Sequence, residues 1–206
     1  GHLDYRQATG GQMAHLYARL SRLNLPPSSV ADVEGLLEAP PASLPSLDIV
    51  VEQLELRGKK LGRIEIEAVN TVAQQARLKM APEWQLKKLN ITVPEATLQS
   101  TGRWLAASDG RPQRQTEIQF KLAVSDAGAL LERLGTPDAL RGGTGKLEGQ
   151  VGWQGSPMAL HYPSMSGQFD VQMGRGQFLK ADAGVAKLLG VLSLQALPRR
   201  LLLDFR

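Results

Sequence analysis

The sequence predicts a mainly β protein built as an antiparallel meander sheet. Apolar and polar residues alternate with period two in three stretches, residues 96–104, 116–125 and 145–155. This alternation is typical of a strand that has one buried and one solvated face. Glycine (21 residues) and proline (12 residues) are plentiful, which favours many turns over long helices. With 42% hydrophobic and 21% charged residues among 206, the chain is able to bury a sizeable core.

The first 45 residues are expected to form a helical N-terminal segment. Residues 11–24 carry apolar side chains at helical spacing, namely Met13, Leu16, Tyr17, Leu20 and Leu23. Pro26-Pro27 ends this helix, and a second short helix is expected over residues 28–39. The dipeptide Gly1-His2 is typical of a tag remnant.

An antiparallel β segment with short helices is expected over residues 46–206, after a proline-rich linker at 40–45. Its first hairpin covers residues 46–72 and turns at 57–60. Further strands are expected at 75–80, 84–93 and 96–104. The Lys87-Lys88 pair interrupts the alternation between Leu86 and Leu89, which predicts a β-bulge at this point.

The second half of the β segment contains the clearest strand, at residues 116–125. Asp126 is a typical N-cap for a short helix over 127–134, which Gly135 and Pro137 end. The remaining expected elements are strands at 145–155, 166–173, 177–179 and 201–205, and a helix at 183–197 that is apolar on most sides.

The residues offer little support for catalysis, and the chain is not expected to be an enzyme. Cysteine is absent, and the three histidines, His2, His15 and His161, form no pair at metal-ligand spacing. The run Gly-Gly-Thr-Gly-Lys at 142–146 lacks the spacing of a phosphate-binding loop, and it leads into a strand instead of a helix. Neither a metal site nor a cofactor is therefore expected.

The charge pattern argues against nucleic acid as a partner. The formal net charge is +4, but the basic residues are scattered. Lys59-Lys60, Lys87-Lys88 and Arg199-Arg200 are isolated pairs that no aromatic residues interleave, unlike the stripe of a single-strand binder. No stretch reaches the roughly 18 uncharged apolar residues of a membrane-spanning helix.

What remains informative is the apolar face of the sheet itself. At least five of the expected strands share such a face, whereas only about four helices, most of them short, are available to cover it. Either two halves of the sheet pack face to face as a sandwich, or the apolar face lines a groove. An open groove would leave an apolar patch that soluble proteins rarely keep without a ligand or a membrane role.

The run at residues 176–205 resembles one known family. A glycine-rich hairpin is followed by a leucine-rich helix, by Arg199-Arg200-Leu201 and by Asp204-Phe205. Shorter matches upstream are Leu47-Asp48, residues 58–62, residues 94–98, Gly102-Arg103-Trp104 and residues 149–153. On these residues, the chain resembles the YhdP branch of the AsmA-like proteins of Gram-negative bacteria over roughly residues 46–206.

This resemblance implies a piece of a large protein that an N-terminal helix of the parent holds in the inner membrane and whose long β structure is periplasmic. Such proteins are similar to bridge-like lipid transfer proteins. Their strongly twisted sheets curl into a groove or half-pipe with an apolar lining, and we expect short helices to pack at its ends. The implied role is to move phospholipids between the inner and outer membranes and to maintain the outer-membrane permeability barrier. The implied partners are phospholipid acyl chains, the inner membrane and the outer membrane, and no catalytic residue is implied.

In a groove, acyl chains would contact the apolar face of the sheet. The candidate lipid-contacting residues are Ile118, Phe120, Leu122, Leu147, Val151, Trp153, Phe169 and Val171. The alternative for the same residues is core packing inside a non-conducting structural or adaptor β-sandwich of an envelope protein.

Overall fold

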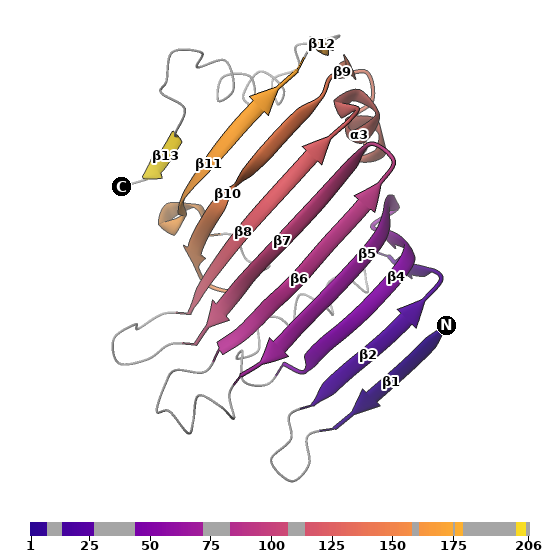
Figure 1. The fold of residues 1–206 in the computed structure, drawn as a ribbon, viewed down its shortest axis with the longest axis vertical. Helices are drawn as coiled ribbons and strands as arrows, with labels where there is room; N and C mark the ends of the chain where they lie inside the picture. The colour runs from indigo at the N-terminus through magenta and orange to yellow at the C-terminus, as the bar shows by residue number, and fades with distance from the viewer. Residues whose placement is uncertain are drawn as a thin grey trace.

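The computed structural model describes residues 1–7, 14–26, 44–71, 83–106, 114–157, 161–174, 176–178 and 201–204. Eleven strands lie in one sheet. The order of its main path is β1-β2-β4-β5-β6-β7-β8-β10-β11-β13 (Figure 1). Strand β3 pairs with β4 off this path. Their bounds are β1 His2–Arg6, β2 His15–Leu20, β3 Leu23–Leu25, β4 Ser46–Leu56, β5 Lys59–Asn70, β6 Glu83–Val93, β7 Ala96–Leu105, β8 Gln115–Val124, β10 Gly145–Gln154, β11 Ser166–Met173 and β13 Leu201–Asp204. A second sheet has two strands, β9 Leu140–Gly142 and β12 Gly176–Phe178. The described helices are α3 Ala127–Arg133 and the short 3-10 helix η2 Tyr162–Ser164.

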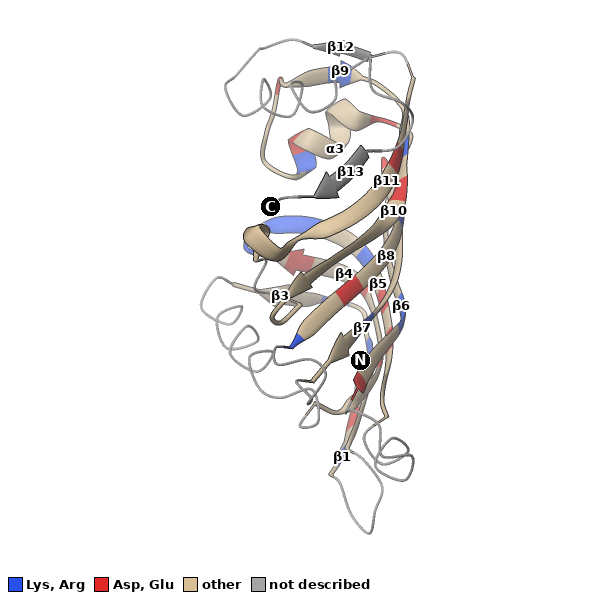
Figure 2. Ribbon diagram, turned by 90° about the vertical axis from the view of Figure 1, so that its left-hand side faces the viewer, with Lys and Arg blue, Asp and Glu red and all other residues tan. Residues whose placement is uncertain are grey.

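The large sheet is open and mostly antiparallel. From β4 to β13, each strand on the path runs antiparallel to its neighbour, and only the pairings of β2 and β3 with β4 are parallel. The sheet does not close into a barrel but curls, with β3 and α3 on the inner side of the curl (Figure 2). The mainly β, curled meander is therefore confirmed. A face-to-face sandwich is not present among the described residues, because their strands form one large sheet and one two-stranded sheet.

The helix expected at residues 11–24 is wrong where the structure describes this part of the chain. Residues His15–Leu20 form strand β2, which lies beside β4, and Ala18 on it is buried. Leu16 and Leu20 are spaced for a helix, but with Ala18 they also alternate as in a strand. Pairing with β1 and β4 decides between the two patterns, since tertiary contacts override such short signals. The second helix expected at 28–39 lies outside the described residues.

The hairpin of β4 and β5 is confirmed, with a two-residue turn at Arg57-Gly58. Both residues have positive φ, 51° and 77°, as the tight turns that match the twist of paired strands require. The bulge in β6 is also confirmed. On the β5 side, Leu86 pairs with Ala68 and Lys88 with Glu67, so Lys87 is the inserted residue. The strand expected at 75–80 lies outside the described residues.

Helix α3 begins where the sequence predicts, because the Asp126 carboxylate accepts a hydrogen bond from the Ala129 amide at 3.0 Å. The helix docks on the turns at one end of the sheet through polar contacts. The Arg133 guanidinium donates two hydrogen bonds, of 2.8 and 2.6 Å, to the carboxylate of Glu95 in the turn between β6 and β7. The same guanidinium donates to the Lys60 carbonyl at 3.3 Å, and α3 itself has no fully buried residue.

The later elements agree with the sequence pattern in part. Strands β8, β10, β11 and β13 occur as predicted. Strand β12 overlaps the strand expected at 177–179, but it pairs with β9 and not with β11. The apolar helix expected at 183–197 lies outside the described residues.

Glycine allows neighbouring strands to approach closely where the sheet bends. A Cβ atom built on Gly149 would lie 2.6 Å from the Cα of Phe169 on β11, and closer still to the Gln168 carbonyl oxygen. At Gly152, on the same strand, the nearest atom would be the Thr116 carbonyl oxygen at 3.3 Å. Gly149 is therefore needed for the approach of β10 to β11, whereas Gly152 has room for a small shift.

We expect Gly149→Ala to destabilise the protein by about 1–3 kcal/mol, because the methyl group forces β10 and β11 apart. Gly152→Ala is the matched control, with a clearly smaller expected loss. Urea unfolding of the two variants measures the difference. Equal losses in both would contradict the close-approach explanation.

The pair of Glu95 and Arg133 makes stability depend on pH. Hydrogen bonds from Arg133 hold the pKa of Glu95 below its ordinary value of 4.5. Because the folded-state pKa is depressed, the stabilisation is complete above this ordinary, unfolded-state value and is lost as the pH falls through the folded-state pKa. Glu95→Gln should therefore lower the free energy of unfolding by about 1.5 kcal/mol near neutral pH and by almost nothing at strongly acidic pH.

Urea unfolding of wild type and Glu95→Gln across this pH range tests the assignment. Glu132→Gln, an exposed position on the same helix, serves as the control and should have little effect at any pH. A constant difference between wild type and Glu95→Gln at all pH values would show that the ion pair is not its source.

Candidate functional site

The cross-strand register gathers the apolar residues of seven strands on one face of the sheet. We call the directly paired positions across β4, β5, β6, β7, β8, β10 and β11 rows. Every member of the first row is apolar: Val51, Ile64, Ile91, Leu98, Leu122, Leu147 and Val171. Directly paired residues in a sheet project to the same side, so this row is one continuous apolar band across the strands.

Two further rows lie beside the first. The second row contains Ile49, Ile66, Leu89, Ser100, Phe120, Gly149 and Phe169. The third row contains Leu47, Ala68, Leu86, Gly102, Ile118, Val151 and Gly167. The three rows together form what we call the apolar face. Leu23 and Leu25 of β3 pack on it against the cluster of Val51 and Ile64, and β3 lies on the inner side of the curl, so the apolar face lines that inner side (Figure 2).

The eight candidate lipid-contacting residues all project to this side of the sheet. Leu122, Leu147 and Val171 belong to the first row, Phe120 and Phe169 to the second, and Ile118 and Val151 to the third. Six of these seven are half-buried, and Val171 is exposed. Each of the seven therefore keeps some surface that a ligand could contact. Trp153, the eighth, is only 3% exposed and offers almost none.

A fourth row, rich in tryptophan, bounds the apolar face at one end of the strands. It contains Asn70, Trp84, Trp104, Thr116 and Trp153. All five are buried. The indole nitrogen of Trp84 donates to the Pro45 carbonyl at 3.0 Å, and that of Trp153 donates to the Ser156 carbonyl at 2.9 Å. This row is packed core, and we name it the tryptophan row.

Trp104 differs from its two neighbours in the tryptophan row. It is 1% exposed, and its indole nitrogen has no hydrogen-bond partner among the residues that the structure describes. A buried donor without a partner costs free energy, whereas a paired one contributes a small net stabilisation. In the described part of the chain, the three indoles are therefore held by apolar packing, and two of them also donate a hydrogen bond.

The opposite face of the sheet is polar, and ion pairs connect its strands. The pairs between neighbouring strands are Arg19–Asp48 at 2.7 Å, Arg63–Glu52 at 3.1 Å, Lys88–Glu65 at 2.5 Å, Arg103–Glu117 at 2.6 Å and Lys121–Glu148 at 3.3 Å. The hydrogen bond from Lys88 is the main cause that lowers the pKa of Glu65. Exposed pairs of this kind contribute little stability singly, but opposite charges on adjacent strands favour the observed register.

Sequence reasoning did not include several members of the apolar face among the candidate residues. Leu86 and Leu89 are three positions apart, so alternation with period two does not place them on the same side of the strand. Leu16 and Ala18 of β2 extend the face toward β1, but the helical interpretation of this stretch concealed them. The bulge predicted from the Lys87-Lys88 pair already implies that Leu86 and Leu89 share one side, and this signal places both on the apolar face.

The fold and the apolar face define the molecule as an open β-sheet protein whose apolar inner face is partly accessible. Soluble proteins rarely keep such a surface without a ligand or a membrane role. The chain belongs to the YhdP family, because the family model described as YhdP protein matches residues 1–206. The match includes residues 1–45, which lie outside the range over which the sequence motifs resemble the family. Membership of this family indicates an AsmA-like envelope protein. No curated protein and no solved structure matches the chain.

In the ranges that the structure describes, no helix is long and apolar enough to cross a membrane. The same ranges contain no group of three or more histidine, aspartate or glutamate side chains placed to hold a metal ion.

The tryptophan row yields a test of its packing. We expect Trp84→Phe to lower the free energy of unfolding by about 1 kcal/mol more than Trp104→Phe does. The reason is that, among the described residues, only the first change breaks a hydrogen bond and leaves the Pro45 carbonyl without the indole donor. Both changes remove a similar apolar volume, so each is the control for the other. Urea unfolding measures the two losses, and an equal or larger loss for Trp104→Phe would show that its indole nitrogen is bonded in solution.

Proposed function

We propose that the apolar face binds phospholipid acyl chains and that the chain is one segment of a path for phospholipids between the inner and outer membranes. The observation that carries this proposal is the unbroken first row, which is apolar in seven consecutive strands and half-buried or exposed in its last five. A bound acyl chain would remove this surface from water, which is favourable by roughly 25 cal/mol per Å² of apolar area.

The geometry supports a particular direction for the bound chain. The tryptophan row bounds the apolar face at one end of the strands, and α3 docks on the turns at the other end. The rows themselves run across the strands without a charged residue. An acyl chain would therefore lie along the rows, crossing from strand to strand, while its headgroup stays in water.

Family membership supports the wider role in this proposal. In this proposal, the segment belongs to a periplasmic β structure whose parent protein is anchored in the inner membrane by an N-terminal helix and contacts the outer membrane. Its activity helps to keep the outer membrane a permeability barrier. In this proposal the segment acts by binding and not by catalysis.

A second candidate function is that of a structural or adaptor segment that conducts no lipid. The burial of the tryptophan row favours it, because Trp104 and Trp153 are only 1% and 3% exposed and are packed like an ordinary core. This alternative predicts that native mass spectrometry of the purified chain detects no bound phospholipid. The lipid proposal predicts that it does.

Photo-crosslinking in cells tests the lipid proposal directly. We expect benzoylphenylalanine at Phe120 and Val151 to form phospholipid adducts, because both positions face the inner side of the curl. Gln119 and Gln150 are the matched controls, since each adjoins one test position on the same strand and projects to the opposite face. Absence of adducts at Phe120 and Val151 at normal protein levels, or equal yields at the controls, would refute the proposal.

A further inference from the structure

A row of uncharged hydrogen-bonding side chains crosses four strands on the polar face. Thr101 pairs with Gln119, Gln119 with Gln150 and Gln150 with Gln168, on β7, β8, β10 and β11. All four side chains are exposed. We call these residues the glutamine row.

The glutamine row lies at two adjoining hollows in the polar face, of about 710 and 740 Å³. Thr101, Gln119 and Gln150 line both hollows, and Gln168 lines the first. In the part of the chain that the structure describes, none of the three glutamine side chains makes a hydrogen bond within the protein. Three carboxamides therefore stand side by side with their donors and acceptors directed to solvent.

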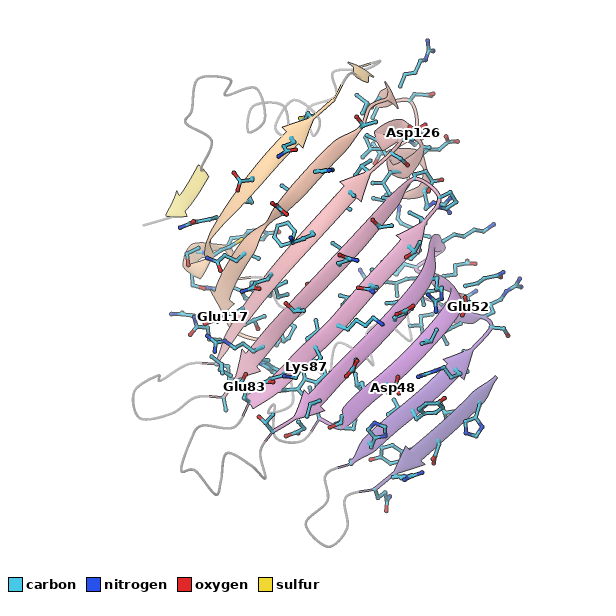
Figure 3. The ribbon with its side chains drawn as sticks, in the orientation of Figure 1. Asp48, Glu52, Glu83, Lys87, Glu117 and Asp126 are labelled. Carbon is cyan, nitrogen blue, oxygen red and sulfur yellow. The ribbon has the colours of Figure 1, made fainter. Side chains whose placement is uncertain are left out.

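Lys87 adds a positive charge at the β6 end of the glutamine row. It is the inserted residue of the bulge, it lines both hollows, and it lies on the face turned toward the viewer in Figure 3. Among the described residues, Lys87 forms no ion pair, whereas the neighbouring Lys88 is paired with Glu65. Bulges often redirect a side chain beside a functional site. At the far end of the hollow, Asp170 on β11 supplies a negative charge.

We propose that this part of the polar face binds a linear glycan that carries a carboxylate, with the carboxylate at Lys87 and uncharged sugars along the glutamine row. Neighbouring strands lie about 4.8 Å apart, close to the length of one sugar in an extended chain, so successive side chains of the row would meet successive sugars. Carboxamides and hydroxyls donate and accept at once, as sugar hydroxyls do. Charge complementarity sets the direction in which the glycan lies across the strands, because Lys87 attracts its carboxylate and Asp170 repels it.

The same geometry disfavours other extended partners. An extended peptide repeats every 3.2–3.4 Å or so, which does not match the spacing of the row, and it would pair with an edge of the sheet instead of crossing a face. Nucleic acid requires several unpaired cations, and the described hollows offer one. This site lies on the face opposite to the apolar face, so it does not depend on lipid binding.

Side-chain amide signals of the ¹⁵N-labelled chain test the proposal. The probes are chitotetraose and its derivative in which the terminal sugar at the non-reducing end is oxidised at C6 to a carboxylate, so that the two sugars differ in one charged group. We expect both to shift the amide signals of Gln119, Gln150 and Gln168, with the acidic sugar binding about three- to fivefold more tightly. Absence of shifts at these glutamines with either sugar overturns the proposal.

Two variants with matched controls separate the parts of the site. Lys87→Gln should remove the preference for the acidic sugar, whereas Lys60→Gln, an exposed lysine outside both hollows, should preserve it. Gln150→Val should weaken the binding of both sugars about two- to tenfold. Thr97→Val, on the same face but outside these hollows, should leave the binding of both sugars unchanged.

The backbone amide spectrum of each variant shows that it remains folded. If glucuronic acid alone reproduces the shifts around Lys87 and the tetrasaccharides bind no more tightly, the site holds an isolated anion and the glycan proposal is wrong. A preference for the acidic sugar that survives in Lys87→Gln would equally overturn the role of Lys87.

Discussion

The structure depends on the phase of the apolar alternation, and the β-bulge that accommodates Lys87 maintains this phase across the middle of the sheet. Leu86 and Leu89 are three positions apart, but the bulge takes up the extra residue, so both project to the same side of β6. If this stretch were a regular strand, Trp84 and Leu86 would face away from Leu89 and Ile91, because a shift of one residue reverses every side chain. The first three rows and the tryptophan row are all continuous through β6 only because of this bulge.

Different kinds of interaction stabilise the two ends of the strands. At one end, three tryptophans exclude water by packing, so that end contributes mainly through apolar burial. At the other end, α3 is attached by the ion pair of Arg133 with Glu95 and buries no residue completely. Elements with few buried apolar contacts are the first to open locally. The α3 end is therefore the end of the apolar face that is easier to uncover.

The same alternation gives the sheet two surfaces of opposite character. Residues such as Phe120 and Val151 face the inner side of the curl, while their neighbours Gln119 and Gln150 face outward. The bulge at Lys87 serves both surfaces, since it keeps the inner rows continuous and places an unpaired lysine on the outer side among the described residues. Gly149 lies between Phe120 and Phe169, and its missing side chain admits the β11 backbone, so this gap is already occupied by the protein.

The sequence by itself determined the β class, the hairpin at Arg57-Gly58, the cap at Asp126 and the bulge, because each depends on residues close together in the chain. It also identified the apolar residues of β8, β10 and β11, whose alternation is unbroken. Only the tertiary structure decided that β2 is a strand, since Leu16 and Leu20 fit two periodicities and the pairing with β4 selects one. It alone decided which apolar residues face solvent and which are core. Trp153 and Val151 belong to the same pattern, but burial depends on what the neighbouring strands place beside each of them.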